Sequence, residues 1–131
     1  MLVLTLASSL SGCAALHRHR CRTGEQVVIH DSLYLGLDTP KGVVTADEFA
    51  DFLKNAVTPR FPQGLTVWQA SGQWRSKDGA IVQEASRILN LVHLDDESTE
   101  AAVLEIAAAY KSRFQQEAVL RVKAYACASL Q

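Results

Sequence analysis

The chain has 131 residues, of which 48% are hydrophobic and 21% charged, with a net charge of −1. This composition is typical of a single globular domain and excludes a disordered chain. It offers no broad basic field for phosphates, so no nucleic acid partner is expected. None of the three cysteines belongs to a Cys-x-x-Cys pair. The sequence therefore predicts no metal site and indicates no other cofactor.

Residues 1–13 have the features of a lipoprotein export signal. Leu2–Leu10 is an apolar run, too short to span a bilayer but long enough for a signal-peptide core. It leads into Leu10-Ser11-Gly12-Cys13, which resembles the bacterial lipobox. The resemblance implies lipidation of Cys13 and a membrane anchor in the cell envelope, facing the periplasm or the exterior. With Ala14 next, it implies the outer membrane if the source is Gram-negative. The alternative is a buried strand with a chance Ser-Gly-Cys.

Residues 14–25 are interpreted as a tether. His17, His19 and Cys21 alternate there as a metal clip would, but arginines stand between them and would repel a metal ion. A solvated basic tether that favours anionic lipid headgroups is the preferred interpretation. Residues 26–131 are predicted to form one α+β domain.

The first elements of this domain are a strand and a helix. Gln26–Leu37 is largely apolar on both faces, with Asp31 as the exception, which is typical of a central strand. A turn at Asp38–Gly42 precedes a helix that begins with a capping box of Thr45 and Glu48. The apolar stripe of this helix is Phe49, Phe52, Leu53, Ala56 and Val57.

A hairpin and a second helix follow. Pro59 ends the first helix, and Leu65–Arg75 is the second predicted strand. Asp78-Gly79 marks a tight turn into a third strand, from about Ala80 to His93. Acidic residues surround the start of a helix near Ser98, where they favour the positive end of its dipole. The stripe of this helix is Val103, Ile106, Ala107, Tyr110 and Phe114.

Ala118–Ala126 is the last strand and completes the order β-α-β-β-α-β. With right-handed crossovers, this order predicts a ferredoxin-like sandwich, a four-stranded antiparallel sheet with both helices on one face. The last strand is expected beside the first, the first beside the third, and the third beside the second. The other face is expected to expose Trp68, Tyr34 and Tyr125. Water, a second subunit in a homodimer, or a ligand would cover it.

Three segments carry a family resemblance: Thr58–Val67, Gly72–Arg75 and Tyr110–Val122. They resemble the bacterial domain-of-unknown-function family 3574, and the resemblance extends over Val27–Ser129. It implies an exported domain and adds no catalytic residues.

A set of polar residues on the strands and the turn after the first helix is a candidate ligand site. The set is Arg60, Trp74, Arg75, Glu84, His30 and His93. The arginines would grip a carboxylate or phosphate, with Trp74 as a stacking wall. In the alternative, Arg75 and Glu84 form only a cross-strand ion pair and the histidines are structural. His30 is not expected to pair with Asp31, because successive strand residues face opposite sides.

No catalytic motif is visible in the sequence. The favoured function is a lipid-anchored envelope domain that binds a small ligand or a partner through its open sheet face or the Arg/Trp loop. One alternative is a small-molecule enzyme of the dimeric ferredoxin-like type, with His30 or His93 in a pocket between two sheets. A structural dimerisation module is the other.

The expected strand order also predicts a disulfide between Cys21 and Cys127. The chain entering the first strand would lie beside the chain leaving the last one. Export would place both residues in an oxidising compartment, and lipidation of Cys13 leaves them as an even pair. The alternative is two free thiols.

Overall fold

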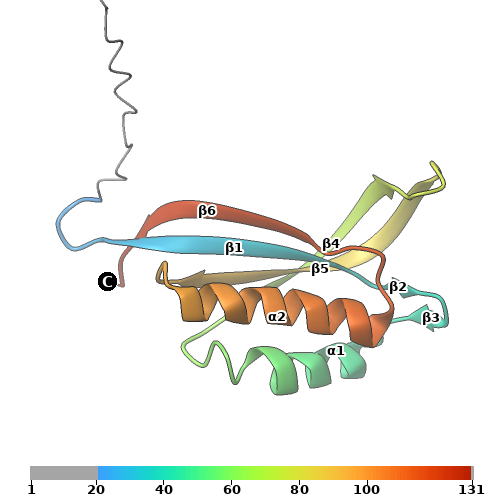
Figure 1. Ribbon diagram of the computed structural model, residues 1–131, viewed down its shortest axis with the longest axis horizontal. Coiled ribbons are helices and arrows are strands. Elements are labelled where there is room, and N and C mark those ends of the chain that lie inside the picture. Colours follow the sequence, from blue (N-terminus) through green and yellow to red (C-terminus); the bar gives the residue numbers. More distant parts are fainter. Residues whose placement is uncertain (1–20, 131) are drawn as a thin grey trace, which may run out of the picture.

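Figure 1 shows the computed structural model, which describes residues 21–130. Four strands form the main sheet: β1 (Gln26–Gly36), β4 (Thr66–Arg75), β5 (Ile81–His93) and β6 (Leu120–Ala128). They are antiparallel, in the order β4-β5-β1-β6. The predicted α+β ferredoxin-like arrangement is therefore confirmed. The proposed signal, the lipidation site Cys13 and most of the tether lie outside the described residues.

The helices α1 (Ala46–Phe52) and α2 (Glu97–Phe114) lie side by side on one face of the sheet (Figure 1). The predicted capping box is present at the start of α1. Thr45 Oγ1 accepts the Glu48 N–H at 3.2 Å, and the Glu48 carboxylate accepts the Thr45 N–H at 2.8 Å. A π-helical turn, η1 (Leu53–Val57), continues α1 where a regular helix was expected. It still buries Val57 completely.

Other element boundaries differ from the prediction by a few residues. The turn after β1 contains a small hairpin of β2 (Asp38–Thr39) and β3 (Gly42–Val43). The cap of α2 is Asp96, which accepts the Thr99 N–H at 2.9 Å, so the helix begins slightly earlier than expected. At its end, Gln115 adopts a left-handed conformation with φ of 53°. The chain needs several further residues to turn, which delays the start of β6.

The hydrophobic core fills the space between the helices and the sheet. Its centre is aromatic: the ring centroids of Phe52 and Tyr110 lie 5.1 Å apart, and those of Tyr110 and Phe114 lie 4.8 Å apart. Each fully buried large side chain stabilises the fold by about 1.5–3 kcal/mol. The buried core residues are Leu33, Leu35, Leu37, Val44, Phe49, Phe52, Val57, Phe61, Leu89, Leu91, Val103, Ile106, Tyr110 and Phe114.

The predicted disulfide is present and joins the two ends of the domain. Cys21 and Cys127 are bonded, with their Cα atoms 5.5 Å apart. Cys127 pairs with Val27 in the β1–β6 ladder, so the strand order brings it next to the segment that precedes β1. Distant positions in the sequence meet because β6 runs antiparallel along β1.

Candidate functional site

The face of the sheet opposite the helices, called here the open face, is largely apolar. One cross-strand row runs over all four strands of the main sheet, from Trp68 through Ile88 and Tyr34 to Leu120. Trp68 is 58% exposed, and Leu120 is 60% exposed. Large apolar side chains in this number are unusual on a surface that meets only water. Among residues 21–130, no helix covers this face (Figure 1).

The face covered by helices contains a charged network on its β6 side. Asp31, the polar exception in β1, is completely buried. Arg121 donates to both of its carboxylate oxygens, at 2.6 and 2.8 Å, and also to Glu100 of α2 at 2.6 and 2.8 Å. Lys123 donates to Glu100 at 2.8 Å. The network thus links β1, β6 and α2.

Tyr125 also lies on this helix side, and its predicted place on the open face is wrong. It pairs with the buried Ile29 in the β1–β6 ladder, and its hydroxyl donates to Asp95 at 3.0 Å. The alternation along β6 decides this, because Arg121, Lys123 and Tyr125 share one face.

His93 completes the network from β5. Its Nε2 lies 2.9 Å from the Asp31 carboxylate, and its Nδ1 lies 2.7 Å from the carbonyl oxygen of Leu94. The carbonyl oxygen of Leu94 and the ionised carboxylate of Asp31 both accept hydrogen bonds, so each ring nitrogen faces an acceptor. Both ring nitrogens are committed and the residue is only 9% exposed. His93 is therefore a structural residue and is not placed to meet a substrate.

The pKa values of the two carboxyl groups reflect these contacts. Burial by itself would raise the pKa of Asp31, but hydrogen bonds from Arg121 and His93, together with their charges, bring it below its ordinary value. Hydrogen bonds from Arg121 and Lys123 lower the pKa of Glu100 to about 2. Both groups are thus ionised at neutral pH, and their charges are matched by cations.

The structure separates the residues of the predicted Arg/Trp site. Arg60 donates to Glu105 of α2 at 3.0 and 3.1 Å, on the helix side of the molecule. Arg75 pairs in register with Ile81, while Glu84 pairs with Gly72, so the two side chains point to opposite faces. The alternative of an Arg75–Glu84 ion pair is therefore wrong. His30 lies on the open face, where it pairs with Val92 and Ala124. Glu84 lies toward the other end of β5, so the two side chains do not share a site.

Trp74 and Glu84 do come together, in a small pocket at the hairpin end of the open face. The Trp74 indole N–H donates to Glu84 Oε1 at 2.9 Å, and the backbone N–H of Asp38 donates to Glu84 Oε2 at 3.2 Å. Tyr34 and Leu120 form further walls of the pocket, which has a volume of about 240 Å³. We call this feature the Glu84 pocket. It places a half-buried carboxylate among apolar side chains.

Gly36 forms the floor of the Glu84 pocket. A Cβ atom at this position would lie 2.7 and 2.8 Å from the two carboxylate oxygens of Glu84, so only glycine lets the carboxylate lie there undisturbed. The carbonyl oxygen of Gly36 accepts the Tyr110 hydroxyl at 2.8 Å. Burial, and then the nearby charge of Glu84, raise the pKa of Tyr110, and Arg87 opposes the shift. The charge of Glu84 therefore affects the pKa of a side chain in the core.

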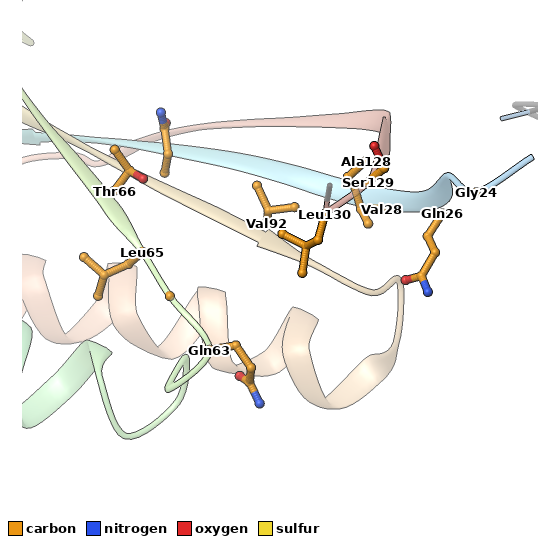
Figure 2. Close-up of a pocket in the computed structure, with 12 residues that line it drawn as sticks. Gly24, Gln26, Val28, Gln63, Leu65, Thr66, Val92, Ala128, Ser129 and Leu130 are labelled. Atoms are coloured by element: carbon orange, nitrogen blue, oxygen red, sulfur yellow. The ribbon is translucent and has the colours of Figure 1, made fainter. Parts of the chain in front are cut away.

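A broader hollow lies at the other end of the open face (Figure 2). Its volume is about 650 Å³, and Val28, Val92, Thr66 and Leu130 are among its lining residues. Its lining contains no ionisable side chain. This hollow offers shape and apolar surface, whereas the Glu84 pocket adds a fixed charge.

The sequence identified Trp74, Glu84 and the exposed Tyr34, but it missed Gly36, Gln116 and Leu120 as pocket residues. They come from β1, from the segment after α2, and from β6. No local pattern joins these segments, because the pocket exists only after the strands have paired. A glycine inside an apolar strand was the one available signal of a close approach.

The described residues were also compared with the requirements for a membrane-spanning helix and for a metal site. Among residues 21–130, no helix is long and apolar enough to cross a membrane. The one His/Cys/Asp/Glu group with metal-like spacing in this part of the chain is Cys21, Glu25 and Cys127. Its two sulfur atoms are joined in the disulfide and are not free thiolates.

Comparison with known proteins identifies a family and a fold. The sequence model of a family described as "Protein of unknown function (DUF3574)" matches residues 30–130. No match was found among curated proteins.

Solved structures share the fold at low sequence identity. A phage SAM lyase in complex with S-methyl-5'-thioadenosine is 17% identical, with a TM-score of 0.59, over 85% of this chain and 94% of that chain. The phage SAM lyase in its apo state is 16% identical, with a TM-score of 0.58, over 97% of this chain and 98% of that chain. CutA from Synechococcus elongatus PCC7942 is 13% identical, with a TM-score of 0.55, over 83% of this chain and 84% of that chain. These likenesses show the fold alone.

Proposed function

Since the chain belongs to the DUF3574 family, whose sequence model spans residues 30–130, we propose that it is an exported, lipid-anchored envelope protein that binds a small molecule in the Glu84 pocket of its open face. One observation carries the proposal: a half-buried carboxylate is held by Trp74 and Asp38 inside a pocket with apolar walls. Ligand sites typically combine such walls with a few fixed polar groups.

The disulfide supports the export part of this proposal. A Cys21–Cys127 bond persists in an oxidising compartment and is rare in the cytosol of most organisms. The anchor depends on Cys13. Expression of the full chain in a bacterium should place it in the membrane fraction with a mass increased by lipid, and Cys13→Ala should lose both properties. Unchanged mass and fractionation in the variant would contradict the anchor.

The binding part is tested by blocking the pocket without disturbing the fold. A Cβ at Gly72 meets nothing within 4 Å, so Gly72→Leu places a side chain in open pocket space. A thermal-shift screen of the full chain in mild detergent should find metabolites that raise the melting temperature, because a ligand that binds only the native state stabilises it. Gly72→Leu should abolish the shift. A hit that survives this substitution binds elsewhere and contradicts the proposed site.

We also propose that a second copy of the chain covers the uncharged cross-strand rows beside the pocket. The rows through Trp68, Asn90 and Val92 contain no Asp, Glu, Lys or Arg, so two copies can meet there without like-charge repulsion. Self-complementary surfaces of this kind form symmetric dimers.

Catalysis is the alternative function, and the SAM lyase fold match is the observation that favours it. In this case a second copy would enclose the Glu84 pocket, and Glu84 would serve as a general base. A bound metabolite would then be converted, and Glu84→Gln would stop turnover even at ligand concentrations that saturate the pocket. Recovery of every screened ligand unchanged would contradict catalysis and leave binding in place.

A further inference from the structure

Three acceptor oxygens converge over Gly36. A Cβ atom there would lie 2.7 and 2.8 Å from the carboxylate oxygens of Glu84 and 2.9 Å from Oε1 of Gln116. The three oxygens therefore surround one small region at the floor of the Glu84 pocket. Acceptors without a donor between them repel each other, so this arrangement favours a group that donates several hydrogen bonds.

The Gln116 amide orientation is fixed by its own partners. Its Nε2 donates to the carbonyl oxygen of Asp38 at 2.7 Å and lies 3.4 Å from that of Phe114. Both partners only accept, so the amide nitrogen must face them. The Oε1 atom is consequently left on the side of Gly36 and Glu84. A flipped amide would lose both contacts.

In the part of the chain that the structure describes, no cation pairs with the charge of Glu84. Its two hydrogen-bond donors, the Trp74 indole and the Asp38 amide, are neutral. Among residues 21–130, no ion pair includes Glu84. Glu117 at the rim adds a second negative charge, and its ion-pair partner Lys77 is 4.0 Å away on a side chain that is 85% exposed.

The walls of the Glu84 pocket favour a ligand that has an apolar part next to this charge. Tyr34, Trp74 and Leu120 line the pocket, and Gly72 leaves space where a side chain would otherwise stand. The volume of about 240 Å³ is below the range of drug-sized sites and suits a ligand of a few carbon atoms or a single ring. Aromatic walls add attraction for a cation.

We propose that the Glu84 pocket binds a protonated primary amine with a short apolar body, whose ammonium group donates to the Glu84 carboxylate and to Oε1 of Gln116. This inference rests on the proposed function, because it names the class of ligand for the same pocket. The ammonium supplies the missing positive charge and carries N–H donors for all three oxygens. The apolar body lies against Tyr34, Trp74 and Leu120.

Nuclear magnetic resonance of the full-length 15N-labelled chain tests this proposal directly. The chain has two tryptophans, so its spectrum contains two indole N–H signals. The Trp74 indole donates to Glu84 and reports on the pocket, whereas Trp68 lies on the same face outside the pocket lining and serves as the internal control. The probes are phenethylamine and 2-phenylethanol, which share a body and differ in charge and donor number.

Phenethylamine should move the Trp74 indole signal in a saturable manner and leave that of Trp68 in place. The alcohol should bind at least about tenfold more weakly, since a hydrogen bond to a charged group contributes more than a neutral one. Glu84→Gln should weaken amine binding by a similar factor. Glu105→Gln, which removes a carboxylate from α2 outside the pocket, should leave binding unchanged. A dispersed spectrum will show that each variant is folded.

The possible results separate this inference from the proposed function. Equal binding of the amine and the alcohol at Trp74 would overturn the inference and leave a small-molecule pocket in place. Failure of the amine to move the Trp74 signal would also overturn it, and the metabolite screen with Gly72→Leu would then decide the proposed function. Equally tight binding of the N,N,N-trimethyl analogue would overturn donation to Gln116, because that analogue has no N–H.

Discussion

The two faces of the sheet carry charge in different ways. On the helix-covered face, Asp31 and Glu100 are matched by Arg121, Lys123 and His93 in a network with short hydrogen bonds. On the open face, the hydrogen-bond donors to Glu84 among residues 21–130 are both neutral. A buried charge whose partners are all present is compensated within the fold, whereas a half-buried charge with no cation among residues 21–130 marks a place where a ligand can supply one.

Asp31→Leu should cause the largest loss in the free energy of unfolding, because it disrupts the network on the helix-covered face. It leaves the buried His93 and the partly buried Arg121 without this carboxylate, and loss of one partner from a buried pair costs about 3–5 kcal/mol. Urea denaturation will measure the free energy of unfolding. Val122→Lys, which adds a charge to the open face, is the control and should change that free energy by about 0.5 kcal/mol or less. Similar losses in both variants would contradict the difference between the faces.

Removal of the disulfide should have the next largest effect. The bond between Cys21 and Cys127 closes almost the whole domain into a loop, and loss of a disulfide typically costs about 2–4 kcal/mol. Replacement of both residues by serine should lower the free energy of unfolding, measured by urea denaturation, by this amount. A reducing agent should then have no further effect on the variant, while it should destabilise the native protein. Peptide mapping without reduction should recover the bonded pair from envelope preparations.

Low pH should destabilise the protein by protonating Asp31 and Glu100 on the helix-covered face. The pKa of Glu100 is lowered from an ordinary value near 4.5 to about 2, and that of Asp31 is lowered as well. A carboxyl group whose pKa is lowered by folding stabilises the native state above its unfolded pKa, and this stabilisation is lost as the pH falls toward the folded pKa. The melting temperature should therefore fall between about pH 4.5 and about pH 2. Arg121→Met should flatten this dependence, and an unchanged slope would refute the assignment.

Trp68→Arg should alter association more than stability. Trp68 lies at the β4 end of a row that we propose a second copy covers, and it is already largely exposed. Analytical ultracentrifugation should show a dimer for the native chain and a monomer for the variant, with unfolding unchanged within about 0.5 kcal/mol. Leu104→Arg on exposed α2 surface is the matched control and should stay dimeric. A monomeric native chain would rule out the second copy.

Gly36→Ala should have a small and local effect, confined to the Glu84 pocket. The new Cβ would displace the flexible carboxylate of Glu84, and loss of its hydrogen bond to Trp74 costs about 1 kcal/mol. The Trp74 indole signal should move even without ligand, while that of Trp68 should not. An unmoved Trp74 signal would show that the carboxylate does not depend on this glycine.

The sequence by itself determined the fold. Periodicity placed all four strands of the main sheet and both long helices, the capping box of Thr45 and Glu48 marked a helix start, and the strand order predicted the disulfide. These features follow from contacts within a segment or from the small set of allowed chain connections, so one-dimensional patterns carry them. Tyr125 was misplaced because its face depended on the alignment of β6 with β1.

Only the tertiary structure decided the candidate site. It separated Arg60 and Arg75 from Glu84, joined His93 to Asp31, and brought Gln116 over Gly36. The placements of Arg75 and His93 depend on strand register, since a shift of one residue turns a side chain to the opposite face. Those of Arg60 and Gln116 depend on how the segments next to the helices pack. The apolar pattern of a strand indicates which side is buried but does not state which distant residue stands beside it. The pocket therefore arises only when β1 has paired with β5 and β6 beside the β4–β5 hairpin that carries Trp74 and Glu84.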